Sequence, residues 1–253
     1  MNSIILCEGI DDLWFVGYYL NKVAGWDDCS NHEKFWNLYQ PHPLSRKQHI
    51  QFFYKNDDCV AIWSVSGKDS FSSAISQIRG FANDYPDNPP DSIVIIRDRD
   101  RDAEEEILSS IETAFDHKVS LSNKTTTAYL ELPEVSDANM LVTPIIIPFN
   151  GEGAIETLLI ESIRAQGTEE AVVVNEANKY IDSLLSSEVV KARYFKHERL
   201  ILKSRFSAVI AATNPTHSTG SFQDVVLSCP WESSAHIKEY FGTIIGAITS
   251  PST

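Results

Sequence analysis

The sequence of 253 residues lacks any apolar run long enough to cross a bilayer, since its longest apolar stretches are short and strand-like. A membrane-spanning helix needs roughly 20 such residues. The four cysteines show neither a CxxC pair nor the spacing of a zinc site. No basic and apolar leader precedes the first apolar run. These absences argue against a membrane partner and a zinc ribbon, and we expect a cytoplasmic protein with reduced thiols.

Positive charge is also scarce. There are 21 Lys and Arg against 35 Asp and Glu, which gives a formal net charge of −14. Such a balance argues against loose coating of nucleic acid, because counterion release needs many cationic contacts. The few cations are nevertheless concentrated, since six lie within one stretch of fifteen residues: Lys191, Arg193, Lys196, Arg199, Lys203 and Arg205. A glycine-rich phosphate loop after the first strand is absent, which disfavours an ordinary nucleotide-processing enzyme.

The chain does contain a regular alternation of strand and helix patterns. Strands are predicted at residues 4–7, 60–65, 92–97 and 141–147, and helices at residues 11–23, 70–83, 102–115 and 154–165. Residues 118–132 alternate in the manner of an edge strand or hairpin. This order predicts an α/β fold, a mostly parallel sheet with helices on both faces.

Two further regions complete the predicted organisation. Residues 25–58 are irregular and are interpreted as an insertion with one strand near residues 49–54. Beyond residue 165 the pattern is mainly helical, with helices expected at 169–185 and 189–211. We therefore predict a catalytic domain over residues 1–165 and a helical C-terminal extension over 166–253 that packs on it.

Five acidic residues follow apolar strands at separate points of the sequence. Glu8 and Asp12 come after the first strand, Asp98 and Asp100 end the third, and Glu156 follows the run Ile145–Ile147. An open α/β sheet places its active site at the carboxyl ends of its strands, so these acids are expected to meet there. Strand spacing would point Asp98 and Asp100 the same way. Gathered carboxylates suit a hard divalent cation such as Mg²⁺.

The order of these short motifs resembles the Toprim domain family. Glu8-Gly9 ends the first strand, Gly67-Lys68 follows the second, and Asp98-Arg99-Asp100 ends the third. The resemblance covers roughly residues 3–165. That domain is shared by topoisomerases, bacterial primases, small ribonucleases and the overcoming-lysogenization-defect (OLD) nucleases. Asp12 and the segment Gly153–Glu156 are similar to the OLD-type and stand-alone members.

The resemblance implies metal-dependent cleavage of phosphodiester bonds with Mg²⁺ or Mn²⁺, through two ions. Glu8 would act in catalysis and in metal binding, with Asp98 and Asp100 as the metal-binding pair. Asp12 and Glu156 would complete a second metal position. The resemblance also implies a role in antiphage defence and an OLD-type ATPase as partner, because this chain carries no ATPase motif.

The basic segment supplies the expected contacts to nucleic acid. Lys196, Arg199 and Lys203 are spaced i, i+3 and i+7, so one continuous helix would place them on a single stripe. Lys203 is also expected to neutralise charge on the phosphate during cleavage, as a lysine does in OLD-type enzymes. Lys68 is a further candidate contact to phosphate.

Simpler interpretations stay open beside these. The basic segment is equally consistent with a solvated face. Gly67-Lys68 is consistent with a tight turn that carries a surface lysine, and Asp11 with an acid in the first turn of a helix. The alternative function is a non-catalytic Toprim-like module that binds nucleic acid or a partner ATPase. The choice between DNA and RNA and the oligomeric state are also open.

Overall fold

A computed structural model describes residues 1–29, 43–84, 89–131 and 139–249 of the protein. It contains one seven-stranded sheet in the order β2-β3-β4-β1-β5-β7-β6. The strands are β1 (Asn2–Cys7), β2 (Asp27–Asp28), β3 (His49–Lys55), β4 (Asp58–Ser64), β5 (Ser92–Asp98), β6 (Ala128–Glu131) and β7 (Asn139–Ile147). The four central strands are parallel and the outer strands antiparallel. The predicted α/β fold with a mostly parallel sheet is confirmed.

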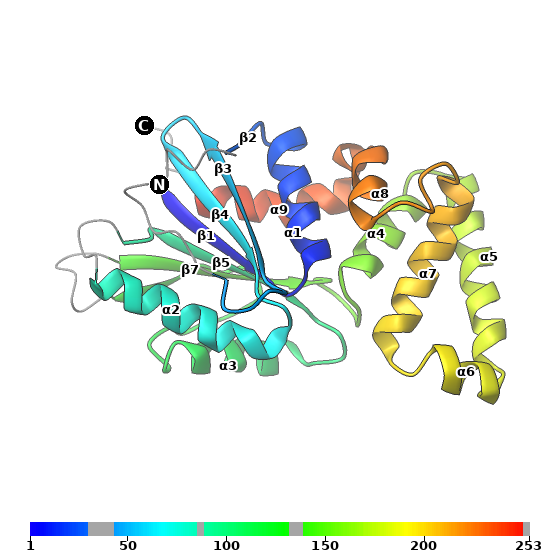
Figure 1. Ribbon diagram of the computed structural model, residues 1–253, viewed down its shortest axis with the longest axis horizontal. Helices are drawn as coiled ribbons and strands as arrows, with labels where there is room; N and C mark the ends of the chain where they lie inside the picture. Colours follow the sequence, from blue (N-terminus) through cyan, green and yellow to red (C-terminus); the bar gives the residue numbers. More distant parts are fainter. Residues whose placement is uncertain (30–42, 85–88, 132–138, 250–253) are drawn as a thin grey trace.

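Helices cover both faces of this sheet (Figure 1). They are α1 (Ile10–Tyr18), α2 (Phe71–Asp84), α3 (Glu104–Ala114), α4 (Ile155–Arg164), α5 (Thr168–Leu185), α6 (Glu188–Tyr194), α7 (Glu198–Thr213), α8 (Phe222–Ser228) and α9 (Ala235–Ile248). Helices α2 and α3 lie on one face, and α1 and α9 lie on the other. None of the helices in the described ranges has the length and apolar character that crossing a bilayer requires.

The central strands are fixed in the protein because both of their faces are apolar and pack against helices. In β1, Ile5 and Cys7 join the core beneath α1 and α9, whereas Ile4 and Leu6 join the core beneath α2 and α3. The continuous apolar runs of the sequence follow from this two-sided burial. Fully burying one such isoleucine or leucine contributes about 1.5–3 kcal/mol, so the sheet is a rigid support for whatever follows its strands.

Pro144 lies in β7, the strand next to the edge. The edge strand β6 pairs only with Asn139–Val142. Among the described residues one side of β7 is therefore without a strand partner at Pro144, so the missing backbone N–H leaves no ladder hydrogen bond unmade there. The expectation of a strand near the edge is confirmed. Within the predicted insertion, residues 49–55 form β3 beside β4, while residues 30–42 lie outside the described ranges.

The C-terminal helices differ from the sequence prediction in one respect. The expected single helix over residues 189–211 is two helices, α6 and α7, separated at Phe195. The Phe195 ring is buried with Ile181 and Ile201 in a small separate cluster, which favours the turn over a continuous helix. Helices α5, α6 and α7 stand beyond the carboxyl ends of the strands, and α9 returns to pack on β1, β5 and β7 (Figure 1).

Candidate metal centre

Acidic residues from four elements gather at the carboxyl edge of the sheet. Glu8 follows β1 and Asp98 ends the neighbouring strand β5, while Asp12 lies in α1 and Glu156 in the first turn of α4. Their exposed fractions are only 6%, 2%, 2% and 1% in the order Glu8, Asp98, Asp12 and Glu156. The structure thus brings together four of the five acids that the sequence singled out.

Backbone groups hold two of these carboxylates in place. Asp12 accepts a hydrogen bond from the Gly9 N–H at 2.7 Å, which fixes the start of α1. Asp98 accepts one from the Ile155 N–H at 3.2 Å, at the start of α4. A carboxylate at a helix N-terminus is favoured by the orphan N–H groups and by the helix dipole. Both helices therefore begin at the site that they help to build.

Burial and mutual repulsion govern the protonation of the acids. Burial raises the pKa of Asp12 to about 7, and the charges of Glu8 and Glu156 add to the increase. Burial also raises the pKa of Asp98 well above its usual range, with further contributions from Asp12, Glu8 and Glu156. The pKa of Glu8 is raised by burial although Arg97 opposes the change. Each carboxylate therefore feels the others, which defines one electrostatic cluster.

Three cations compensate part of this negative charge. Arg97 Nε lies 2.9 Å from Glu8 Oε1, and Arg199 Nη1 lies 2.7 Å from Asp98 Oδ2. Lys203 Nζ lies 2.6 Å from Asp11 Oδ2 and 3.3 Å from Glu156. Arg199 and Lys203 are four residues apart on α7, so one face of that helix meets the acids. A buried carboxylate needs such partners because desolvation of an unpaired charge is costly.

The compensation is incomplete. Among the described residues, Asp12 Oδ1 and both carboxylate oxygens of Glu156 are buried without a hydrogen-bond partner, although Lys203 Nζ lies 3.3 Å from Glu156 Oε1. Buried polar atoms are paired in the great majority of cases, and an unmade hydrogen bond costs about 1–3 kcal/mol. Unpaired carboxylate oxygens are the donor set that Mg²⁺ and Mn²⁺ prefer. The residues present therefore fit a hard divalent cation.

The side chains do not stand in a closed ligand shell as they are. Among the residues in the described ranges, no group of three or more His, Cys, Asp or Glu side chains is arranged to hold a metal ion. The ion pairs give the physical reason, because Arg97, Arg199 and Lys203 draw the carboxylates toward themselves. Binding of a divalent cation requires these pairs to loosen.

Asp100 departs from its expected position. Strand β5 ends at Asp98, and Asp100 has a left-handed backbone with φ of 49°. Its N–H donates to the Gly153 carbonyl at 2.6 Å and its carbonyl accepts from the Gly153 N–H at 2.8 Å. This bridge turns the chain, so the expected strand spacing of Asp98 and Asp100 is wrong. The half-buried Asp100 still raises the pKa of Glu8 by its charge.

Gly153 is required by the same bridge. Its φ is 135°, and a Cβ at this position would lie 2.1 Å from Thr157 Oγ1. The glycine of the Gly-x-Ile-Glu segment therefore serves the geometry of the site by letting the chain approach Asp100 and then enter α4.

The predicted basic stripe is only partly present. Arg199 and Lys203 face the acids, but Lys196 precedes α7 and is exposed, so it does not share their helix face. The i, i+3, i+7 stripe is wrong because the chain turns at Phe195. Lys68 pairs with Asp102 at 3.2 Å on the surface. Arg199, predicted as a contact to nucleic acid, pairs with Asp98.

Two cavities reach this cluster from solvent. One of about 340 Å³ is lined by Asp100, Gly153 and Arg199 among others. The second, of about 180 Å³, is lined by Asp11, Glu156, Lys203 and Phe206 among others. The face of α7 that carries Arg199 and Lys203 lies between them. A solute in the second cavity would meet Glu156, whereas one in the first would meet Asp100 and Arg199.

Arg97 is the site residue whose role the sequence prediction missed. It occupies a strand of otherwise apolar side chains and is 5% exposed. A charged residue in a fully buried strand needs a partner, and this requirement is readable from the sequence. Cys7 pairs with Ile96 in the parallel register of β1 and β5. Glu8 therefore lies beside Arg97 and is its natural partner.

Residues 2–242 match the family described as a protein of unknown function, DUF3226. The chain belongs to this family. No curated protein matches it. The family assignment covers nearly the whole chain, including the sheet, the acidic cluster and helix α7, and it carries no statement of activity.

Two solved structures are similar in fold. A hypothetical protein from Pyrococcus horikoshii OT3 is 13% identical, with a TM-score of 0.50 over 96% of this chain and 100% of that chain. A protein with unknown function from Thermoplasma acidophilum is 10% identical, with a TM-score of 0.25 over 80% of this chain and 86% of that chain. The first likeness concerns the fold alone, and the second carries no argument.

Proposed function

We propose that this protein is a metal-dependent nuclease that cleaves phosphodiester bonds in DNA or RNA with Mg²⁺ or Mn²⁺. One observation carries the proposal: four carboxylates from four elements are buried together at the carboxyl edge of the sheet, opposite two cations of α7. Crowded carboxylates repel one another unless a cation binds among them. A polyanion with phosphodiester bonds is the substrate that suits a divalent cation flanked by basic side chains.

The residues that would hold the metal are Glu8, Asp12, Asp98 and Glu156, with Asp100 at the border of the cavity. Their oxygens include three buried atoms without a hydrogen bond. Such an ion supplies Lewis-acid stabilisation of the charge on a phosphoryl group. The two-ion arrangement belongs to the proposal through the likeness of the sequence motifs to Toprim nucleases.

The basic residues of α7 would then serve the substrate. In this structure Arg199 forms an ion pair with Asp98, and Lys203 forms ion pairs with Asp11 and Glu156. A divalent cation that neutralised Asp98 and Glu156 would weaken their hold on Arg199 and Lys203, while the contact of Lys203 with Asp11 would remain. Lys203 has 43% of its side chain exposed and can reach a phosphate in the second cavity. A cation that meets the developing phosphoryl charge acts mainly in the transition state.

The remaining parts of the proposal concern the setting of the protein. A cytoplasmic location is proposed because nucleic acid and Mg²⁺ are both abundant there. Binding of nucleic acid would involve Lys196 and Lys68, which are exposed on either side of the site. An OLD-type ATPase partner and a role in antiphage defence follow only from the motif resemblance.

A second candidate is a non-catalytic module that binds nucleic acid or a partner ATPase. The observation that favours it is the set of ion pairs that already occupies the acids. If those pairs persist in the presence of Mg²⁺ or Mn²⁺, the cluster is a structural network and not a centre for hydrolysis. The two candidates therefore differ in whether the metal displaces Arg199 and Lys203.

The experiment that separates them uses the full chain with supercoiled plasmid, single-stranded DNA and tRNA. Each substrate is incubated with Mg²⁺, Mn²⁺ or EDTA, and binding of Mn²⁺ is measured in parallel by calorimetry. Cleavage that requires metal supports the nuclease. Binding of metal without cleavage of any substrate supports the second candidate, and absence of metal binding contradicts both the metal site and the nuclease.

Paired variants on one helix provide the control. Glu156→Gln removes a buried carboxylate of the cluster, whereas Glu161→Gln removes an exposed carboxylate one turn further along α4. We expect Glu156→Gln to lower cleavage at least 100-fold and Glu161→Gln to leave it unchanged. Equal activity of the two variants would show that the cleavage comes from elsewhere or from a contaminant.

A further inference from the structure

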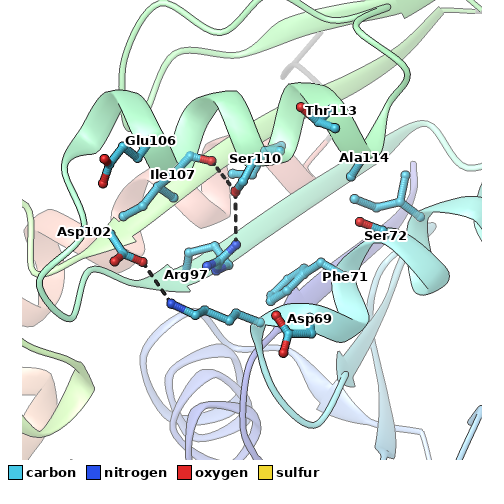
Figure 2. A pocket seen from close by; sticks show the side chains of 13 residues that line it. Asp69, Phe71, Ser72, Arg97, Asp102, Glu106, Ile107, Ser110, Thr113 and Ala114 are labelled. Carbon is cyan, nitrogen blue, oxygen red and sulfur yellow. Dashed lines mark hydrogen bonds and ion pairs between the residues drawn. The ribbon is translucent and has the colours of Figure 1, made fainter. Parts of the chain in front are cut away.

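A larger cavity lies on the other face of the sheet, between α2 and α3 (Figure 2). Its volume is about 530 Å³. It is lined by Lys68, Asp69, Phe71, Ser72, Ile75, Arg97, Asp102, Glu106, Ile107, Ser110, Ile111, Thr113 and Ala114. None of the buried acids Asp12, Asp98 and Glu156 belongs to this lining. Its interior lies apart from these acids, although Asp102 at its rim also lines the cavity of about 340 Å³ beside Asp100 and Arg199.

Arg97 lies in the floor of this cavity, below Ser110 and beside Phe71 (Figure 2). Its Nε donates to Glu8 at 2.9 Å and its Nη1 contacts Ser110 Oγ at 3.4 Å. The guanidinium carbon lies 5.1 Å from the centre of the Phe71 ring. A guanidinium has five N–H donors. Among the described residues Nη2 has no acceptor, so part of this buried cation remains available to a ligand.

The rest of the lining divides into a polar mouth and an apolar wall. At the mouth Lys68 and Asp102 form an exposed ion pair at 3.2 Å, with Glu106 on the adjacent turn of α3. Ser72 and Thr113 line the cavity from the two helices, and the Thr113 hydroxyl donates to the Ser109 carbonyl of its own helix at 2.8 Å. The wall consists of Ile75, Ile107, Ile111 and Ala114. A ligand would meet a cation inside, apolar surface along its length and carboxylates at the entrance.

We propose that this cavity binds a phosphorylated small molecule the size of a mononucleotide, with its phosphate on Arg97. The volume is within the range of about 300–1,000 Å³ that is typical of small-molecule sites. Arginine recognises phosphate through several parallel N–H donors, and Ser110 supplies a hydroxyl beside it. The apolar wall suits a base, and the carboxylates at the mouth suit the hydroxyls of a sugar.

This site needs neither a metal nor cleavage of nucleic acid. Glu8 leaves Arg97 with unused donors instead of saturating it, since only Nε is bonded to that carboxylate. A phosphate has more oxygen acceptors than a carboxylate, so it can meet both Nη atoms and Ser110 together. The same chemistry is present in free inorganic phosphate, and the experiment separates it from a nucleotide.

The test is calorimetric titration of the full chain in EDTA with adenosine 5′-monophosphate, adenosine and inorganic phosphate. EDTA keeps any metal in the acidic cluster from binding the phosphate. We expect the monophosphate to bind with a stoichiometry of one, and adenosine and inorganic phosphate each to bind at least 10-fold more weakly. No binding of the monophosphate, or equal binding of adenosine, would overturn the proposal.

A matched pair of variants locates the binding. Ser72 and Ser73 are both exposed on the first turn of α2, but only Ser72 lines the cavity. Ser72→Trp fills the cavity and should weaken the monophosphate at least 10-fold, whereas Ser73→Trp should bind like the wild type. If Ser72→Trp does not fold, Thr113→Trp on α3 takes its place. If the tryptophan variant that fills the cavity binds adenosine 5′-monophosphate as tightly as the wild type, the nucleotide binds at another surface and the proposal is contradicted.

Discussion

The acids carried by strands and the acids carried by helices are supported differently. Glu8 and Asp98 follow strands, and each is bonded to an arginine, at 2.9 Å and 2.7 Å. Asp12 and Glu156 lie on helices, and each retains at least one buried oxygen without a hydrogen bond. The strand acids are therefore part of a salt-bridge network, whereas the helix acids are the less satisfied members of the cluster.

This difference suggests a division of labour in the proposed metal site. The strand acids are fixed by the sheet and by their arginines, so they define where the site is. In the described part of the chain neither helix acid is ion-paired with an arginine, so these acids would gain most from a divalent cation. Helix α7 contacts both kinds of acid, because its Arg199 pairs with the strand acid Asp98 and its Lys203 with the helix acid Glu156. Variants that remove a partner or an acid test this division.

The largest effect is expected for Arg97→Met, which leaves Glu8 buried and unpaired. Breaking a buried ion pair by removing one partner costs about 3–5 kcal/mol. Chemical denaturation should show a loss of this size. The double variant with Glu8→Gln removes both charges and should recover most of it. If the single variant is as stable as the wild type, the strand acids are not part of a network and the division fails.

Divalent metal is expected to stabilise the protein by a somewhat smaller amount. A ligand present at 100 times its dissociation constant stabilises by about 2.7 kcal/mol, so Mn²⁺ should raise the melting temperature by several degrees. EDTA should reverse the shift. Glu156→Gln should abolish it and Glu161→Gln should preserve it. A shift retained by Glu156→Gln would mean that this helix acid does not bind the metal.

The sequence allowed much of this arrangement to be predicted. Each central strand contains a run of at least three apolar residues, so the sheet and the acids at its carboxyl edge followed from local pattern. The pairing of Asp98 with Arg199 could not be predicted in this way, because it joins residues 101 positions apart and depends on how α7 docks. The turn at Phe195 likewise depends on contacts with Ile181 and Ile201 that exist only in the folded chain.

Asp12→Asn should have a moderate effect that depends on pH. The folded-state pKa of Asp12 is raised to about 7 from 3.8, mainly by burial. The free energy of unfolding therefore falls as pH rises from 3.8, the pKa of Asp12 in the unfolded chain, to about 7, its pKa in the folded protein. Over this range the unfolded chain ionises the carboxyl group freely, whereas the folded protein must ionise it while it is buried. The asparagine keeps an oxygen for the Gly9 N–H and carries no charge. Without metal, we expect it to stabilise the folded state at pH 8, where the wild type must ionise a buried carboxyl group, and to change its stability very little at pH 4.

Melting curves of the metal-free wild type and of Asp12→Asn between pH 4 and pH 8 measure this difference. The curves should converge near pH 4 and separate progressively up to about pH 7, with the variant higher. The sign would be opposite if the Asp12 carboxylate were stabilised by its surroundings. A variant that is less stable than the wild type at pH 8 would place Asp12 with the strand acids and not with the helix acids.

The smallest effect is expected for Lys196→Ala. Lys196 is exposed before α7 and has no part in the ion pairs of the cluster, so its removal should leave the free energy of unfolding within about 0.5 kcal/mol. If nucleic acid contacts Lys196, the Lys196→Ala variant should bind it slightly more weakly, and the slope of log affinity against log salt concentration should shrink by about 1.

Arg199→Ala provides the contrast, because it leaves Asp98 without its arginine and should lower stability as well. Filter binding at several salt concentrations, together with denaturation of both variants, measures the two effects separately. Equal losses of stability in the two variants would mean that the pairing of Arg199 with Asp98 contributes nothing, and the contrast between contact to substrate and support of the acids would no longer hold.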